Sequence, residues 1–406
     1  MVLRRAEAVL KVTAITVAAV SLMGAATVSS CGRRRPRAVA YPEVKRQELK
    51  EVQVRVLLFE TRTPVLVTLD KGGTAEVIEG GAVSRMQLEP VADMGVSPVT
   101  FGIQLGSRAV ACSRLRIVPA EGSGVCVEGG TYRGSLHLVR QGDDALLGIN
   151  EVGLEEYVAS VVGAEMPARW PLEALKAQAI AARTYALYKA RQRAEGLFSL
   201  YADTRDQMYR GLSSETVRAA EAAEATRGVF ALYSGRLFPT FYHSTCGGQT
   251  EPAERALSVP ALPPLGGVSC RFCTQSRHYR WTAEVDASEV SRAALEQGYR
   301  LGDVQAIESM PVESEREWRR VRVVRVDGSS VSLPAEVFRN ALGSGVIRSV
   351  MFEAHRSGER LVFEGRGWGH LAGMCQWGAR GMALEGYGAN EIMGHYFPGV
   401  ELVKAY

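Results

Sequence analysis

The sequence has little excess charge of either sign, no internal repeat and no low-complexity segment. Its 406 residues include 48 Lys and Arg against 44 Asp and Glu, and 46% of them are hydrophobic. A chain of this length and composition can bury one large core or two moderate ones, which excludes a disordered or fibrous protein. The formal net charge of +4 gives no reason to expect a nucleic-acid partner, because such proteins carry concentrated basic surfaces.

A phosphate-binding loop is also missing. The glycine-rich stretch GRGWGHLAGMCQWGARG at 365–381 lacks the GK[ST] ending of such a loop. We therefore expect its glycines to let the backbone pass close to a substrate or to a packed strand.

The first 31 residues have the composition of an export signal. Basic residues near the start precede an apolar run to Val28, and two serines follow before Cys31. This ending resembles a lipobox, which predicts a lipid-modified Cys31, with a plain cleaved signal or an uncleaved membrane helix as alternatives. Cleavage before Cys31 removes three basic residues and one acidic residue, so the charge falls to +2. Residues 32–46, with four arginines at their start, are expected to form a basic tether on anionic headgroups. The domain is then extracytoplasmic and membrane-anchored, or secreted to the cell envelope.

The rest of the chain predicts an α+β protein with two domains. From 47 to 130, alternating apolar residues such as those in VQVRVLLF, with glycine-rich breaks, indicate a β-rich N-terminal domain. Residues 131–406 indicate a mixed α+β domain. Cys112 and Cys126 flank a predicted turn, and in an exported protein a disulfide between them is expected.

Glu165 lies at the end of a predicted helix. Apolar residues recur at helical spacing from Leu154 to Val162, and Pro167 should end the helix because the residue before a proline avoids α geometry. Pro171 suits the first turn of the next helix, which continues through an alanine-rich segment. Glu165 is therefore expected at a helix C-terminus with apolar neighbours, where burial and the helix dipole both raise the pKa of a carboxyl group.

Several blocks in order resemble the SpoIID/LytB family of stage II sporulation protein D and amidase-enhancer proteins. They are NEVGLEEYVASVVGAEMP, PLEALKAQAIAARTYAL, DTRDQMYRG, FYHSTCGGQTE, GRGWGHLAGMCQWGARGMA and IMGHYFPGVEL, over some 270 residues. The resemblance implies an extracytoplasmic lytic transglycosylase that cleaves peptidoglycan glycan strands, preferring strands stripped of stem peptides. It places the catalytic acid at Glu165. By matching position, it implies substrate-binding roles for Lys176, Gln178, Arg183, Gln207, Tyr209, His243, Ser244, His370 and Gln376.

The residues themselves fit this chemistry. Glycosidases usually need two carboxylates, but a lytic transglycosylase can use one, because the muramic acid 6-hydroxyl replaces water as the nucleophile. Asp203 and Asp206 are the only credible second carboxylates within these blocks. Lys176 and Arg183, seven residues apart, should share a helix face and could meet the lactyl carboxylate of muramic acid, or form a solvated basic stripe. Three tryptophans could stack on sugars or belong to the core: Trp170, Trp368 and Trp377.

Four further cysteines suggest a metal. The number and spacing of these cysteines match a closed, structural zinc site: Cys246, the CxxC pair Cys270 and Cys273, and Cys375. His278 or His243 could replace one thiolate. Two disulfides, or free buried thiols, are the alternatives.

The main rival to an enzyme is a non-catalytic cell-wall module of the amidase-enhancer kind, which binds glycan and stimulates a separate amidase. The intact block around Glu165 disfavours it. A zinc hydrolase is disfavoured because four thiolates leave no open position on the metal.

Overall fold

The computed structural model describes residues 52–79, 82–142, 144–257, 259–310 and 320–406. These residues all belong to one compact unit. The predicted signal segment, Cys31 and the basic tether lie outside the described residues. No helix in the described ranges combines the length and apolar character needed to cross a membrane.

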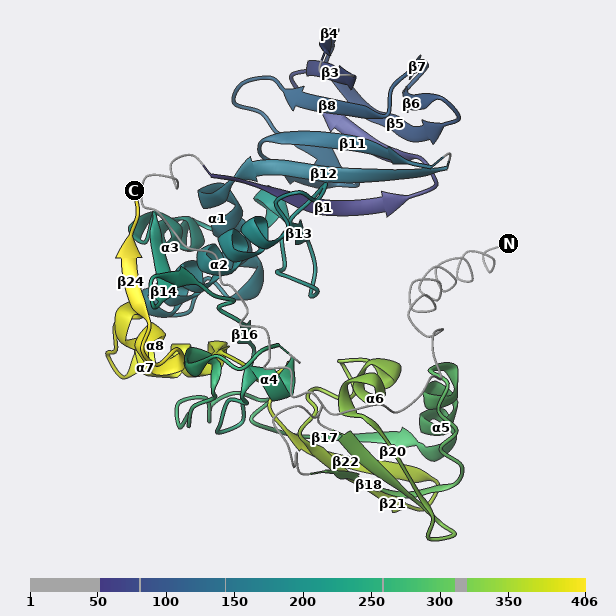
Figure 1. Cartoon of the computed structure of the whole chain (residues 1–406), viewed down its shortest axis with the longest axis vertical. Coiled ribbons are helices and arrows are strands. Elements are labelled where there is room, and N and C mark those ends of the chain that lie inside the picture. Colours follow the sequence, from purple (N-terminus) through teal and green to yellow (C-terminus); the bar gives the residue numbers. More distant parts are fainter. Residues whose placement is uncertain (1–51, 80–81, 143, 258, 311–319) are drawn as a thin grey trace, which may run out of the picture. The chain divides into compact units, whose positions relative to one another are not determined.

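Two β-sheets form the N-terminal part of the chain, as the alternating pattern predicts (Figure 1). One sheet has the order β13-β1-β12-β11-β8-β3-β4 and the other β10-β9-β2-β5-β6-β7. The strands of the first are β1 (Gln53–Thr61), β3 (Gly73–Glu79), β4 (Ala82–Leu88), β8 (Arg114–Pro119), β11 (Ser135–Gln141), β12 (Ala145–Gly153) and β13 (Leu200–Tyr201). Those of the second are β2 (Val65–Leu69), β5 (Val91–Val99), β6 (Gly102–Leu105), β7 (Arg108–Val110), β9 (Val125–Val127) and β10 (Gly130–Tyr132). Alternate residues of β2 and the residues Leu115 and Ile117 of β8 are buried in a shared apolar core that includes Val67.

The structure does not join Cys112 and Cys126 in the disulfide that the sequence predicts. Cys112 is buried in the core of the β-sheets, whereas Cys126 lies between the buried Val125 and Val127 on β9. Because successive side chains of a strand point to opposite faces, Cys126 points away from the core that holds Cys112. A disulfide needs Cβ atoms that face one another at about 4 Å.

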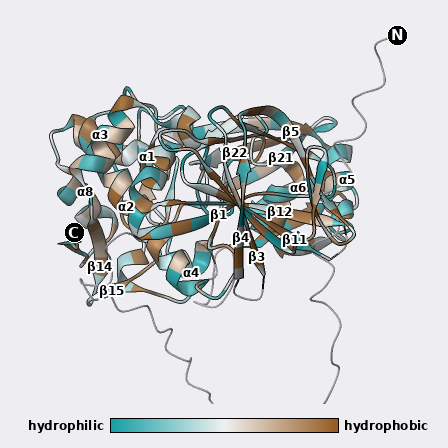
Figure 2. Ribbon diagram, turned by 90° about the horizontal axis from the view of Figure 1, so that it is seen from above, coloured by the Kyte–Doolittle hydropathy of each residue, from teal (hydrophilic) through white to brown (hydrophobic). Residues whose placement is uncertain are grey.

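A helical core follows the β-sheets. It contains α1 (Leu154–Glu165), α2 (Leu172–Gln192), α3 (Val217–Ala225), α7 (Gln376–Leu384) and α8 (Ala389–Tyr396), with the 3₁₀ turn η2 (Gly211–Ser214). Two small sheets complete it: β15-β14-β24, from β14 (Val229–Tyr233), β15 (Arg236–Leu237) and β24 (Glu401–Lys404), and β16-β23, from β16 (Tyr242–His243) and β23 (Met374–Cys375). Helix α2 is buried along most of its length because alanines let α1, α3 and α7 pack closely against it. Figure 2 shows hydrophobic and hydrophilic residues alternating along α1 and α2.

A separate apolar cluster lies between the fourth and fifth sequence blocks. It is formed by a six-stranded antiparallel sheet, in the order β17-β22-β21-β18-β19-β20, with two helices. The strands are β17 (Arg280–Asp286), β18 (Val304–Ser309), β19 (Arg320–Arg325), β20 (Ser330–Pro334), β21 (Phe352–Ser357) and β22 (Arg360–Arg366), and the helices are α5 (Ala287–Glu296) and α6 (Ala335–Leu342). A short helix, α4 (Ala253–Ala256), and the turn η3 (Pro263–Leu265) precede them. The observed architecture is therefore α+β, as predicted.

Candidate functional site

Glu165 is the last residue of α1, as the proline pattern predicts. The next residue, Met166, is extended with φ −127° and ψ 139°, and Pro167 follows it. Pro171 is the N-cap of α2. The Glu165 side chain is partly buried and lies at the negative end of the α1 dipole. Burial raises its pKa above the usual range of a glutamate, and three hydrogen bonds only partly oppose this effect.

Three donors from three other segments converge on the Glu165 carboxyl group. The backbone N–H of Met208 donates to Oε1 at 2.9 Å, and the Tyr242 hydroxyl donates to the same oxygen at 3.5 Å. The Gln376 amide Nε2 donates to Oε2 at 3.3 Å. Glu165 is thus placed by residues that are 43, 77 and 211 positions away in the sequence.

Gln207 fixes the direction of the Tyr242 hydrogen bond. Its amide Nε2 donates to the Tyr242 hydroxyl at 2.9 Å, and its Oε1 accepts from the Tyr157 hydroxyl at 3.0 Å. Because the Tyr242 oxygen already accepts a hydrogen bond from Gln207, its own proton is directed to Glu165. Burial raises the pKa of Tyr157 and Tyr242 well above that of an ordinary tyrosine, so both remain donors.

Close packing against α1 brings the segment of Met208 to Glu165. A Cβ atom on Gly163 would lie 1.8 Å from the Ser214 carbonyl oxygen, so only glycine allows η2 to approach this closely. Ser214 Oγ donates to the Ser160 carbonyl at 2.9 Å, and Ser160 Oγ accepts from the Arg210 N–H at 3.4 Å. These contacts hold residues 207–214 against the last two turns of α1.

The other predicted site residues on α2 lie apart from this group or lack a described partner. Arg183 is fully buried, and its Nη2 pairs with Glu155 at 2.6 Å and also donates to the Ala223 carbonyl, while its Nη1 donates to the Val229 carbonyl. Lys176 pairs with Glu173 at 2.7 Å. Both cations are thus engaged within the protein. Gln178 is fully buried, and neither amide atom has a hydrogen-bond partner among the described residues.

Tyr209 and the two histidines also lie outside the first contacts of Glu165. Tyr209 donates to Asn150 Oδ1 at 2.7 Å and packs against Tyr132 and Tyr157. The His243 and His370 rings are 5.6 Å apart between centroids. Burial lowers the pKa of His243 to about 3 and that of His370 to about 4, so both are neutral at physiological pH.

Ser244 contacts the first turn of α7, because its carbonyl accepts a hydrogen bond from the Trp377 N–H at 3.0 Å. Its hydroxyl lies 3.3 Å from that of Thr245.

Neither of the two predicted second carboxylates is free. The Asp206 side chain is fully buried and contacts Lys189 at 3.2 Å, Arg193 at 2.8 Å and the Tyr185 hydroxyl at 2.8 Å. Asp203 is bound by Arg205, whose guanidinium approaches to 2.6 Å and lowers the pKa of the carboxyl. Glu165 is therefore the carboxyl group with a raised pKa in the part of the blocks that the structure describes.

The four predicted cysteines come together in one buried cluster. The Sγ atoms of Cys246, Cys270, Cys273 and Cys375 all lie within 4.8 Å of one another, none forms a disulfide, and all four side chains are fully buried. A tetrahedral zinc site with Zn–S bonds of about 2.3 Å places its sulfurs about 3.8 Å apart. The observed separations fit that size, so the cluster could bind a metal ion such as zinc. Neither His243 nor His278 belongs to this group of possible ligands.

The cysteine cluster adjoins the Glu165 site through two strands and a helix. Cys375 is the N-cap of α7, and the next residue, Gln376, contacts Glu165. Strands β16 and β23 pair Tyr242 with Met374 and His243 with Cys375. A Cβ on Gly378 would lie 1.9 Å from the Tyr396 hydroxyl and 2.7 Å from Cys270 Sγ, so α7 packs directly against the cluster.

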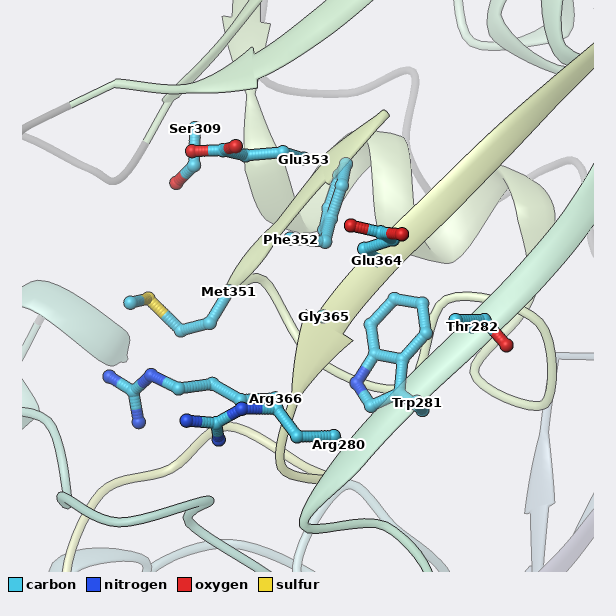
Figure 3. A pocket seen from close by; sticks show the side chains of 10 residues that line it. All are labelled: Arg280, Trp281, Thr282, Ser309, Met351, Phe352, Glu353, Glu364, Gly365 and Arg366. Carbon is cyan, nitrogen blue, oxygen red and sulfur yellow. The ribbon is translucent and has the colours of Figure 1, made fainter. Parts of the chain in front are cut away.

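A hollow of about 610 Å³ lies elsewhere, on the six-stranded sheet. Figure 3 shows Glu353 and Glu364 toward one end of it and Arg280 and Arg366 toward the other. Arg366 contacts the cysteine segment, because its Nη1 donates to the Cys246 carbonyl at 2.7 Å. None of the predicted site residues lines this hollow.

Sequence reasoning missed two groups that contact Glu165. Tyr242 stands in the block FYHSTCGGQTE directly before His243 and Ser244, which are predicted, and its position in that block is the available signal. The Met208 N–H contributes through the backbone, so no residue type indicates it.

The fold and the site define an α+β protein whose helical core presents one partly buried carboxyl group beside a cluster of four thiols. The family described as "SpoIID: Stage II sporulation protein" matches residues 142–233, which contain Glu165, Gln207 and Met208. Stage II sporulation protein D of Bacillus subtilis (strain 168) is 30% identical over 272 residues, covering 63% of this chain and 76% of that protein.

Two further relatives extend the comparison. An uncharacterized protein of Brachyspira hyodysenteriae (strain ATCC 49526 / WA1) is 33% identical over 281 residues, covering 69% of this chain and 74% of its own. The amidase enhancer of Bacillus subtilis (strain 168) is 25% identical over 287 residues, covering 60% of this chain and 40% of that protein. The chain belongs to the SpoIID family.

Proposed function

We propose that this protein is an extracytoplasmic lytic transglycosylase that cleaves peptidoglycan glycan strands between N-acetylmuramic acid and N-acetylglucosamine. The observation that carries the proposal is the Glu165 carboxyl, partly buried, raised in pKa and held by three donors. A general acid works best when its pKa is close to the working pH, and burial moves Glu165 in that direction.

In the proposed reaction, protonated Glu165 donates its proton to the glycosidic oxygen as the bond from that oxygen to C1 of muramic acid breaks. The resulting carboxylate then takes the proton of the muramic acid 6-hydroxyl, whose oxygen bonds to C1. The product carries a 1,6-anhydro ring, no water is consumed, and Glu165 ends the cycle protonated.

The surroundings of Glu165 suit both of its protonation states. Two donors bind Oε1, whereas Oε2 receives only the 3.3 Å contact from Gln376, so Oε2 is the better place for the proton. A side-chain amide can turn over and present its oxygen instead of its nitrogen. Gln376 can thus donate to the carboxylate and, when turned, accept from the protonated acid.

The engagement of the other carboxylates supports the use of the sugar's own hydroxyl. A hydrolase needs a second carboxylate to activate water. Asp203 and Asp206, the two candidates, are bound by arginine and lysine side chains. One carboxyl that first gives and then takes a proton is sufficient for the intramolecular reaction.

We further propose that the four cysteines hold a structural zinc ion. Four thiolates fill a tetrahedral site and leave no position for substrate, so zinc would supply folding energy rather than catalysis. Because Cys375 caps α7 and Cys246 follows Tyr242 by four residues, the ion would fix the two segments that carry Gln376 and Tyr242.

The predicted lipid at Cys31 and the basic tether would hold the domain on the extracytoplasmic side of the membrane, near its glycan substrate. We also propose a cell-wall amidase as a partner, because such an enzyme would remove the stem peptides from the glycan strands. The similarity to an amidase enhancer favours a second candidate function, glycan binding that stimulates such an amidase.

The two functions differ in their response to Glu165→Gln. The variant keeps the shape of the side chain but has no proton to donate, so cleavage of purified, peptide-free glycan strands should fall by about 10²–10⁴-fold. Activity within about threefold of the wild type would contradict the assignment. No cleavage by the wild type, with glycan binding and stimulation of an added amidase, would establish the enhancer function.

A further inference from the structure

The hollow of about 610 Å³ on the six-stranded sheet has no part in the proposed reaction. Alternate residues of strand β22, such as Leu361 and Phe363, are buried in the apolar cluster with α5 and α6. Glu364 follows them on the exposed side, and its direct neighbours across the sheet are Thr282 on β17 and Glu353 on β21. These three residues therefore project from the face opposite the two helices (Figure 1).

Two carboxylates stand side by side at one end of this hollow. Glu353 and Glu364 are directly opposite each other on adjacent antiparallel strands, and both are exposed. Neither forms an ion pair within the described ranges. Like charges in this position destabilise a sheet, so the pair attracts a cation. In the part of the chain that the structure describes, only the cysteine cluster has the geometry of a metal site. The cation that fits the two glutamates is therefore an ammonium group.

The other end of the hollow is basic. Arg280 and Arg366 are directly opposite each other on β17 and β22, two residues along the strand from Glu364. Two residues of a strand span about 7 Å. Arg366 pairs with Glu251 at 2.9 Å. Arg280 has no ion pair among the described residues; its Nη1 donates to two backbone carbonyls, which leaves Nε and Nη2 to bind an anion.

Trp281 brings an unused donor to the same hollow. Its side chain lines the hollow and is only 4% exposed. Its indole N–H has no hydrogen-bond partner among the described residues, and Figure 3 shows the ring nitrogen on the side of Arg280 and Arg366. Buried donors are nearly always paired. The missing acceptor indicates that the arginine end receives a ligand that accepts hydrogen bonds.

We propose that this hollow binds a zwitterionic amino-acid group, in which one carbon atom carries both an ammonium and a carboxylate. The ammonium pairs with Glu353 and Glu364, and the carboxylate pairs with Arg280. Such a group is a few ångströms wide. With one hydrogen bond at each side, it spans the distance of about 7 Å between the acidic and the basic residues.

The source of this group is the stem peptide of peptidoglycan, where the free end of a diamino-dicarboxylic acid residue carries both charges on one carbon. This identification rests on the proposed function, which brings the protein to the cell wall. A phospholipid headgroup can also carry both charges, but a surface that enters lipid needs exposed apolar side chains. None of the residues that line the hollow is an exposed large hydrophobic residue. The bound peptide holds the protein on the wall without occupying the Glu165 site.

The test measures the affinity of the purified full chain for three capped peptides, acetyl-Ala-γ-Glu-X-amide, by isothermal titration calorimetry. Residue X is meso-diaminopimelate, which has the zwitterionic end, lysine, which has only the ammonium, or 2-aminopimelate, which has only the carboxylate. The wild type should bind the diaminopimelate peptide at least about tenfold more tightly than either analogue, because each analogue loses a charge-assisted hydrogen bond.

Two variants remove one end of the hollow each. Glu353→Gln/Glu364→Gln should lose the preference over the 2-aminopimelate peptide, and Arg280→Gln should lose the preference over the lysine peptide. Both variants should still cleave peptide-free glycan strands like the wild type. Glu289→Gln/Glu296→Gln removes two exposed charges from α5 and is the matched control, which should keep both preferences.

Peptide binding needs no catalysis, so a failure of this site can be told apart from a failure of the proposed function. If the wild type cleaves no glycan, the function fails, but a diaminopimelate preference that the two variants lose still supports the site. Equal affinity of the wild type for the three peptides overturns it, as does a preference that survives the substitutions. Binding to phosphatidylethanolamine vesicles in place of the peptides would assign the hollow to a lipid headgroup and also overturn it.

Discussion

Replacing Tyr242 with phenylalanine should shift the pH dependence of cleavage upward. The Tyr242 hydroxyl donates to Glu165 Oε1 at 3.5 Å and so stabilises the ionised carboxylate and lowers its pKa. Hydrogen bonds to charged groups contribute about 1.5–3 kcal/mol, and this long one should contribute about 0.7 kcal/mol, or roughly half a pKa unit. Without the hydroxyl, Glu165 stays protonated to higher pH, and the alkaline limb of kcat/KM against pH should rise by about half a unit.

The same substitution also removes the 2.9 Å acceptor of the Gln207 amide, so the free energy of unfolding should fall by about 1–2 kcal/mol. Tyr185→Phe is the matched control, because it removes another largely buried hydroxyl that donates to a carboxylate, that of Asp206, at 2.8 Å. The control should lose similar stability and leave the alkaline limb in place. A limb that is unchanged or lower in Tyr242→Phe would refute the role given to this hydrogen bond.

Three further predictions concern stability and metal content. Because burial raises the folded-state pKa of Glu165, its contribution to stability is present below about pH 4.3 and is lost as pH rises through the folded-state pKa. Glu165→Gln should therefore unfold at a higher temperature than the wild type at pH 7 and lose that advantage near pH 4. A lower melting temperature of the variant at pH 7 would contradict the burial of the carboxyl group. The soluble domain without residues 1–31 should contain one zinc ion by elemental analysis, and Cys270→Ser should lower both its zinc content and its melting temperature. A metal-free protein with disulfides among the four cysteines would contradict the zinc site. Arg183→Met should lower the free energy of unfolding by about 3–5 kcal/mol in chemical denaturation, because it leaves the partly buried Glu155 without its cationic partner. A loss below about 1 kcal/mol would show that the ion pair does not stabilise the fold.

The sequence predicts those parts of the site that depend on local rules. Pro167 must end the helix within two residues, which places Glu165 at a helix C-terminus, and the small apolar residues around it give the direction of its pKa shift. The count and spacing of four cysteines predicts that they gather, because isolated buried thiols rarely occur in such a pattern. These features need no knowledge of how distant segments meet.

The remaining features depend on tertiary packing, which a single sequence does not specify. The partners of Glu165 come from three distant segments, and one of them is a backbone N–H. Lys176 and Arg183 share a helix, but the segment around Thr226 buries Arg183 and turns it toward Glu155. The expectation of a Cys112–Cys126 disulfide rests on a predicted turn between them in an exported protein, whereas strand alternation directs Cys126 to the opposite face of its sheet.

The most direct test of the central claim is digestion of peptide-free glycan strands in ¹⁸O-labelled water, with the products analysed by mass spectrometry. If Glu165 acts alone as acid and base and the 6-hydroxyl is the nucleophile, every new muramic acid end is a 1,6-anhydro ring that contains no ¹⁸O, and Glu165→Gln gives about 10²–10⁴-fold fewer such ends. New reducing ends that carry ¹⁸O would show that water is the nucleophile, and would contradict the account.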